Sequence, residues 1–178
     1  MATTEAIREL TTKMEQERSA LLALASSIDE ATAECRPPEG EGEEAWSVKE
    51  QLSHLAEMEV SYRAWVGRAL VEERPDVSTG TQRDPVAYPL ERAHDATVAE
   101  HVDELRRQRE RTMALIARIE PDEYERTAHT AAFGELTVMQ WLRSYYRHDR
   151  MHQAQIEGRQ PDYQPRYASG REPDQRRR

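Results

Sequence analysis

The residues of this chain best suited to chemistry are two histidines in its last quarter, His148 and His152. Four residues apart on a helix, their side chains lie on one face, one turn above the other. That spacing lets both imidazole rings reach one metal ion. Two adjacent inward-facing imidazoles favour such an ion, because protonated rings repel each other and neutral rings each need a donor and an acceptor.

A third histidine, His54, lies in a similar helical context far upstream. Three neutral imidazoles around one ion, with one position left open, are the coordination of a catalytic metal site. Imidazole suits Zn, Ni, Cu and Fe(II), so the ligand type does not select the metal. Glu57, one turn after His54, is a candidate general base or fourth ligand. The sequence therefore predicts a metal site of His54, His148 and His152, with Glu57 as the catalytic candidate.

A simpler interpretation competes with this one. A histidine pair at this spacing is common on solvent-facing helices, and a single histidine beside an apolar stripe is usually a satisfied core residue. We interpret the other histidines, His94, His101 and His129, as structural or solvated. Cys35, the single cysteine, excludes an intramolecular disulfide and is interpreted as a small buried or half-buried residue rather than a nucleophile.

Charged and aromatic residues surround the histidine pair. Arg147 and Arg150 flank it and are interpreted as surface charges, although one of them could meet an anionic substrate. Aromatic residues at helical spacing usually form core, but here they could also line a pocket: Trp46, Trp65, Trp141, Tyr145 and Tyr146.

Four helical segments must position these side chains. Apolar residues at helical spacing predict helices over about 4–32 and 91–119, and two more that open at Ser47 and Thr137. The last two begin with capping boxes, Ser47-Val48-Lys49-Glu50 and Thr137-Val138-Met139-Gln140, and Gly158 is the expected cap at the end of the fourth helix.

These helices predict an all-α protein, a four-helix bundle with long connections in which neighbouring helices could run parallel. The polar connection 75–89 is long enough to be a lid. We assign residues 1–160 to the bundle domain. Residues 161–178 are expected to form an extended or disordered, Arg-rich C-terminal tail.

The composition limits the partners. The chain has 178 residues, which suits one domain, and a formal net charge of −9. An acidic surface repels phosphate backbones, so we do not expect nucleic acid as a partner. The sequence has no apolar stretch of membrane-spanning length and no signal-peptide region, so we expect no membrane association and a cytoplasmic protein.

Two segments resemble the DinB-like (YfiT-like) superfamily: the capped helix 46–55, and 134–142 leading into the spacing His148-xxx-His152-xxx-Ile156. The resemblance covers roughly positions 4–160. It implies a four-helix bundle in which the positions of His54, His148 and His152 bind a divalent metal, often Ni or Zn. Relatives include thiol transferases and isomerases that use low-molecular-weight thiols such as bacillithiol or mycothiol. Homodimers are common in the family, and the sequence does not decide whether this chain forms one.

The leading hypothesis is a metal-dependent enzyme that activates a low-molecular-weight thiol or water for attack on a small electrophilic substrate, as a thiol S-transferase-like enzyme or a hydrolase. The alternative is a non-catalytic metal- or ligand-binding stress-response protein. An open coordination position beside a cavity would favour the enzyme, and a closed shell of four ligands would favour the alternative. A third hypothesis is a bundle whose histidines are only core residues.

Overall fold

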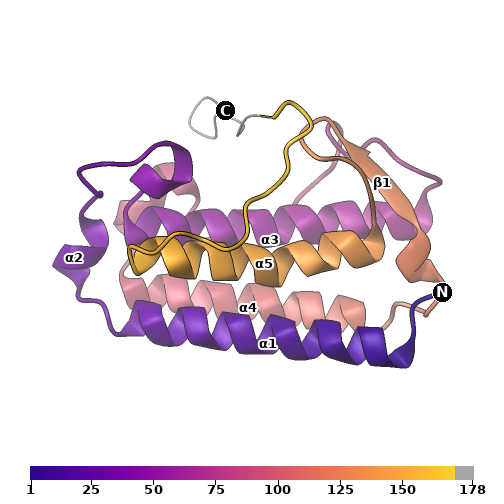
Figure 1. Cartoon of the computed structure of the whole chain (residues 1–178), viewed down its shortest axis with the longest axis horizontal. Helices are drawn as coiled ribbons and strands as arrows, with labels where there is room; N and C mark the ends of the chain where they lie inside the picture. Colours follow the sequence, from indigo (N-terminus) through magenta and orange to yellow (C-terminus); the bar gives the residue numbers. More distant parts are fainter. Residues whose placement is uncertain (171–178) are drawn as a thin grey trace.

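The computed structural model of the chain describes residues 1–170. Its four long helices form a bundle, which confirms the predicted fold class (Figure 1). The elements in chain order are α1 (Thr4–Ser26), α2 (Glu30–Glu34), η1 (Gly42–Ala45), α3 (Val48–Val71), η2 (Leu90–Asp95), α4 (Val98–Ile116), η3 (Glu123–Glu125), β1 (Thr127–Thr130), β2 (Gly134–Thr137) and α5 (Val138–Ile156). Within residues 1–170, no helix has both the length and the apolar character needed to cross a membrane.

The capping residues predicted for α3 and α5 are confirmed. Ser47 caps α3 in a reciprocal capping box with Glu50, and Thr137 caps α5 in the same way with Gln140. Gly158 has φ +67°, a conformation that glycine adopts at little cost, and its N–H donates to a carbonyl in the last turn of α5. The start and end of the helix that carries the histidine pair are therefore determined by local side-chain chemistry.

Two predicted helices have different bounds in the structure. The predicted helix 4–32 is two helices, because the Asp29 side chain caps a new helix, α2. The predicted helix 91–119 is wrong at its start, because α4 begins only after Thr97, which forms a further capping box with Glu100. In both cases a short polar side chain bonds to the backbone and starts a new helix where the apolar pattern alone suggests continuity.

The order of the helices gives parallel neighbours. Helix α1 packs against α5, α3 packs against α4, and both of these pairs run parallel (Figure 1). Helix α5 also packs antiparallel to α3. The long connection after α3 returns along the length of the bundle, so α4 starts at the same end as α3. This arrangement brings the amino-terminal half of α3 beside the carboxyl-terminal half of α5.

A small antiparallel hairpin, β1 and β2, lies between α4 and α5. Thr127 pairs with Thr137 at its base, so Thr137 both ends β2 and caps α5. The hairpin adds to the bundle without changing its class. The connection after α3 is fastened to it, because the Val77 N–H donates to the His129 carbonyl and the His129 N–H donates to the Pro75 carbonyl.

The predicted lid, residues 75–89, is also held at its other end. The Arg83 guanidinium donates to Ser61 Oγ at 2.7 Å, and Ser53 Oγ donates to the Tyr88 carbonyl at 2.8 Å. Both serines belong to α3. These contacts make the connection a fixed wall beside α3 rather than a free flap.

The chain after α5 turns back along that helix and rises to the hairpin (Figure 1). The ring of Tyr167 stacks on Phe133 with 5.2 Å between centroids, and the Ala168 N–H donates to the Ala132 carbonyl. The part of the predicted tail up to residue 170 is thus extended and packed. Residues 171–178 lie outside the described residues, and the domain boundary at 160 stays a prediction.

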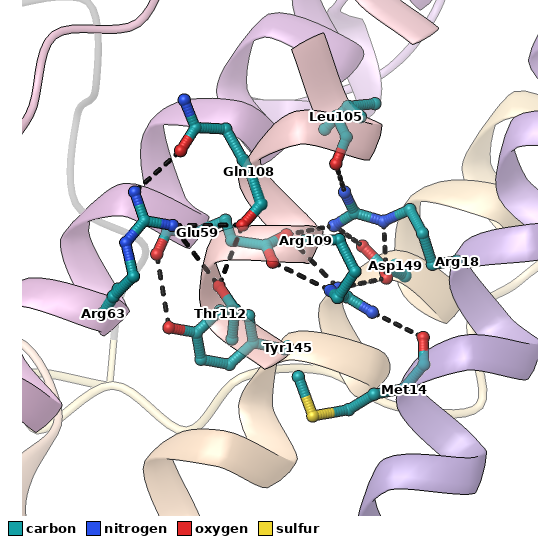
Figure 2. A network of polar contacts seen from close by, with 10 residues as sticks. All are labelled: Met14, Arg18, Glu59, Arg63, Leu105, Gln108, Arg109, Thr112, Tyr145 and Asp149. Atoms are coloured by element: carbon teal, nitrogen blue, oxygen red, sulfur yellow. Dashed lines mark hydrogen bonds and ion pairs between the residues drawn. The ribbon is translucent and has the colours of Figure 1, made fainter. Parts of the chain in front are cut away.

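A buried network of charges ties the four long helices together (Figure 2). Each helix supplies one member: Arg18 from α1, Glu59 from α3, Arg109 from α4 and Asp149 from α5. Arg18 contacts Glu59 at 2.6 Å and Asp149 at 2.8 Å, and Arg109 contacts the same two carboxylates at 2.8 and 2.9 Å. All four side chains are buried, so their charges are balanced within the protein.

The network also shifts the pKa values of its acids. Burial by itself raises the pKa of Glu59, but the guanidinium groups of Arg109 and Arg18 outweigh it and hold that pKa below its ordinary value. Burial acts in the same way on Asp149, and the two arginines again lower its pKa. Both carboxylates are therefore ionised at neutral pH and stabilise the fold only in that form.

This pairing predicts a pH dependence that a Glu59→Gln variant isolates. An unfolded glutamate titrates near about pH 4.3, and the folded pKa of Glu59 is lower, so its stabilisation is present above about pH 4.3 and is lost as the pH falls towards the folded pKa. The difference in unfolding free energy between wild type and Glu59→Gln should be largest at neutral pH and shrink below about pH 4. Urea denaturation between pH 3 and 8 measures it, and a pH-independent difference would contradict the assignment.

Candidate metal centre

The structure brings the three predicted histidines together and adds an acid that the sequence interpretation missed. His54 from α3 meets His148 and His152 from α5, and Glu43 from η1 joins them. One ligand atom from each residue lies within 4.8 Å of the others, and all four residues are buried. Nitrogen and carboxylate oxygen donors in such a cluster could hold one divalent cation.

The distances within the group are short. His54 Nε2 lies 3.1 Å from Glu43 Oε1, and His152 Nε2 lies 3.5 Å from Glu43 Oε2. The Nε2 atoms of His148 and His152 are only 3.0 Å apart. Two ring nitrogens at that distance either share one proton or direct their lone pairs at a common cation, so the donor set fits a metal ion.

Gln51 orients His152. Its side-chain oxygen accepts a hydrogen bond from the Nδ1–H of His152 at 3.0 Å, and its amide nitrogen donates to the Trp46 carbonyl at 3.2 Å. Protonation of Nδ1 leaves the Nε2 lone pair of His152 free to point into the group. Ligand histidines usually have such a partner, which fixes both the tautomer and the ring orientation.

Burial and charge shape the titration of the group. Burial by itself raises the pKa of Glu43, but the neighbouring His54, His148 and His152 outweigh it, and the pKa lies well below its ordinary value. Burial, followed by the proximity of His148, lowers the pKa of His152 well below its ordinary value. A neutral imidazole and an ionised carboxylate are the forms that bind a metal.

Glu43 belongs to the acidic loop before α3, where several glutamates are locally alike. Gly40 has φ +145° and Gly42 has φ +58°, and these left-handed turns direct the loop so that Glu43 faces inward. Trp46 follows, and its ring meets the His54 ring edge-on at 4.9 Å between centroids. A signal was present in the sequence: two glycines in an acidic stretch, directly before the capped helix that carries His54.

Glu57, the predicted catalytic residue, is not part of the group. It is half-buried and lines, together with His54, a cavity of about 570 Å³. Arg36, Arg83 and His94 also line this cavity. Glu57 lies one turn from His54, and this position is compatible with a general base that acts in the cavity. That role stays a prediction.

A second cavity, of about 850 Å³, reaches the group from His148. It lies between α5 and the extended segment after that helix, and Trp141 and Tyr146 line it. Trp65 lines a third cavity, so three of the aromatic residues considered from the sequence belong to cavity walls as well as to the core.

The remaining candidates have ordinary surroundings. His101 is buried and its Nε2 lies 2.8 Å from the Ala93 carbonyl, a structural contact as predicted. His94 and His129 are exposed. Cys35 is also exposed, so the prediction of a buried or half-buried residue is wrong. It follows the short helix α2, where the chain leaves the bundle.

Comparison with known proteins agrees with this geometry. The sequence pattern of the DinB superfamily matches residues 13–156. The chain belongs to the DinB superfamily. One related protein is the uncharacterised protein YuaE of Bacillus subtilis (strain 168). It is 28% identical over 123 residues, which are 64% of this chain and 76% of YuaE.

Two solved structures share the DinB-superfamily fold. YfiT from Bacillus subtilis, described as "a probable metal-dependent hydrolase with an unusual four-helix bundle topology", superposes with a TM-score of 0.70 at 16% identity, over 89% of this chain and 87% of YfiT. A mycothiol-dependent maleylpyruvate isomerase superposes with a TM-score of 0.63 at 15% identity. That match covers 88% of this chain but only 63% of the isomerase. At these identities the likeness concerns the fold.

Proposed function

We propose that this DinB-superfamily protein is a metal-dependent enzyme in which His54, His148, His152 and Glu43 hold a divalent cation such as Zn²⁺ or Ni²⁺. The reaction is the attack of a low-molecular-weight thiol or of water on a small electrophile, as in a thiol S-transferase or a hydrolase. A bound cation would lower the pKa of the thiol or water and so supply the nucleophile near neutral pH.

The chain's own residues supply the rest of the site. Gln51 holds the ring of His152 in the tautomer that keeps Nε2 free. Trp46 covers His54 on one side and helps to exclude bulk water. Glu57 lies in the cavity beside His54, where a carboxylate could accept a proton from the incoming nucleophile. The cytoplasmic location and a homodimer remain predictions.

One observation carries the proposal: a buried His₃Glu group that cavities reach from two sides. A purely structural site needs no cavity on either side. Two cavities suit a reaction between two small molecules, because a thiol and an electrophile could approach the same group from His54 and from His148.

Glu43 favours a second candidate function, a non-catalytic metal-binding protein. Three histidines and one carboxylate complete the four-coordinate shell that structural zinc sites have. A metal with a higher coordination number, or a shift of Glu43 away from the cation, would leave a position for a nucleophile. The two functions therefore differ in whether a small ligand can reach the metal.

Cobalt(II) substitution distinguishes them. The test uses a Cys35→Ser background, because the exposed thiol of Cys35 could bind cobalt itself. We expect about one cobalt ion per chain, by elemental analysis, and a thiolate-to-cobalt charge-transfer band when 2-mercaptoethanol is added. A Glu43→Ala variant in the same background opens the shell and is the positive control.

Each outcome is decisive. A band in both proteins supports the enzyme. A band only in Glu43→Ala shows a closed shell and favours the non-catalytic protein, and so does cobalt that binds to both proteins without a band in either. Failure of cobalt, zinc and nickel to bind either protein would contradict both functions and leave a bundle with histidines in its core.

A further inference from the structure

The cavity beside His148 has a wall that the bundle itself does not provide. Residues 162–166 of the extended segment after α5 line the cavity together with residues of α5. The volume, about 850 Å³, is in the range of small-molecule sites. His148 connects this space to the metal group, so a molecule bound there would lie beside the reacting atoms.

The charge of this cavity is opposite to that of the chain. Four cationic side chains line it, against one carboxylate, in a protein of net charge −9. The cations are Lys13, Arg147, Arg150 and Arg166, and the acid is Asp162. A local excess of positive charge at a concave site attracts small anions.

Arg147 is the cation best placed to bind one. Lys13 is paired with Glu9 at 2.6 Å, Arg150 is paired with Asp162, and Arg166 is exposed to solvent. Arg147 is half-buried between the rings of Tyr146 and Tyr163, with its guanidinium carbon 5.9 and 5.5 Å from their centroids. Within residues 1–170 it forms no ion pair with a carboxylate. A guanidinium beside two rings, with no carboxylate partner, can offer its fork of donors to a planar anion.

Tyr62 supplies a second donor near the metal group. Its ring lies 6.3 Å from the His148 ring, centroid to centroid, and it lines the cavity although it is only 5% exposed. Its hydroxyl forms no hydrogen bond with any residue of the described part of the chain. A tyrosine hydroxyl has an ordinary pKa of about 10, so it keeps its proton at neutral pH and can donate it. The half-buried rings of Phe133 and Tyr163, which also line the cavity, offer apolar surface to a bound molecule.

We propose that this cavity binds a small organic carboxylate with a planar apolar body. Its carboxylate contacts Arg147, its body packs against Phe133, and its far end meets the Tyr62 hydroxyl beside His148. The inference rests on the proposed function in one respect: the bound anion would be the electrophile presented to the metal group. Binding to the cavity itself needs no metal.

The test measures binding to metal-free protein, treated with a chelator and checked by elemental analysis, so that a carboxylate cannot bind through a cation. The probes are 4-fluorobenzoate and the neutral 4-fluorobenzamide, followed by ¹⁹F NMR and calorimetry. We expect the anion to bind at least about tenfold more tightly than the amide. Arg147→Gln should weaken 4-fluorobenzoate binding at least about tenfold, whereas Arg143→Gln, one turn earlier on α5 and outside the cavity, should change it less than about twofold.

Equal affinity for the two probes, or equal effects of Arg147→Gln and Arg143→Gln, would overturn the proposal. Tyr62→Phe should weaken binding about threefold with no change in circular dichroism, and an unchanged affinity would remove the hydroxyl from the site. A protein that binds 4-fluorobenzoate in this pattern but fails the cobalt test keeps the anion site and loses only the enzymatic function.

Discussion

A His152→Ala variant is expected to bind Zn²⁺ or Ni²⁺ more than about 100-fold more weakly than the wild type. His152 is the most deeply buried member of the group, and its Nε2 lies 3.0 Å from His148 Nε2 and 3.5 Å from Glu43. Loss of an outer-shell partner of a metal ligand costs about 10–100-fold in affinity, and loss of a ligand itself should cost more. Competition with a chelating dye measures the effect.

A Gln51→Leu variant should weaken metal binding less than His152→Ala does. It removes the acceptor of the His152 Nδ1–H but leaves all four donor atoms, so the affinity should fall by about 10–100-fold, less than in His152→Ala. The exposed His94 provides the control, because His94→Ala removes an imidazole from outside the group and should leave the affinity unchanged. Full metal binding by a folded His152→Ala protein would contradict the assigned ligands.

An Arg109→Met variant is expected to lose about 3–5 kcal/mol of unfolding free energy. Arg109 bridges the carboxylates of Glu59 and Asp149 in the centre of the bundle and also donates to the Met14 carbonyl (Figure 2). The methionine fills much of the same space, so most of the cost comes from two buried carboxylates that keep only Arg18 as a cation. Urea denaturation at neutral pH measures this difference.

Arg106→Met is the matched control on the same helix. Arg106 is exposed and pairs with Asp103 at the surface, where an ion pair contributes little. Similar stability losses in the two variants would mean that the buried network does not hold the bundle together. Replacement of all four charged members by apolar residues of similar size should lower the unfolding free energy far less than the sum of the four single replacements. In that variant no uncompensated buried charge remains.

The network matters to the candidate metal centre because it also contains a residue of α5, Asp149. Asp149 directly follows His148 in the sequence, and its pairing with Arg18 and Arg109 sets the rotation of α5 about its axis. With Asp149 directed at α1 and α4, His148 and His152 face α3 and η1. The buried ion pairs thus contribute to placement of the histidines as well as to stability.

The helix starts and the inward faces of the helices could be predicted from the sequence, because both depend on residues that are neighbours along the chain. The capping boxes at Ser47 and Thr137 set where α3 and α5 begin. Their apolar spacing places His54 and the His148–His152 pair on inward faces. Helix boundaries failed where a local cap, at Asp29 or Thr97, interrupted a continuous apolar pattern.

Only the tertiary structure decided what the histidines meet. The acids of the loop before α3 are locally alike, and Glu43 is selected because the loop closes over a cluster assembled from two distant helices. The partner of His152 is Gln51, 101 residues away in the chain, rather than an acid close to it. Arg18, Glu59, Arg109 and Asp149 come from four different helices, and the parallel packing of α1 with α5 and of α3 with α4 brings their charges together. Contacts between residues far apart in sequence depend on how whole helices pack, and no local pattern encodes that packing.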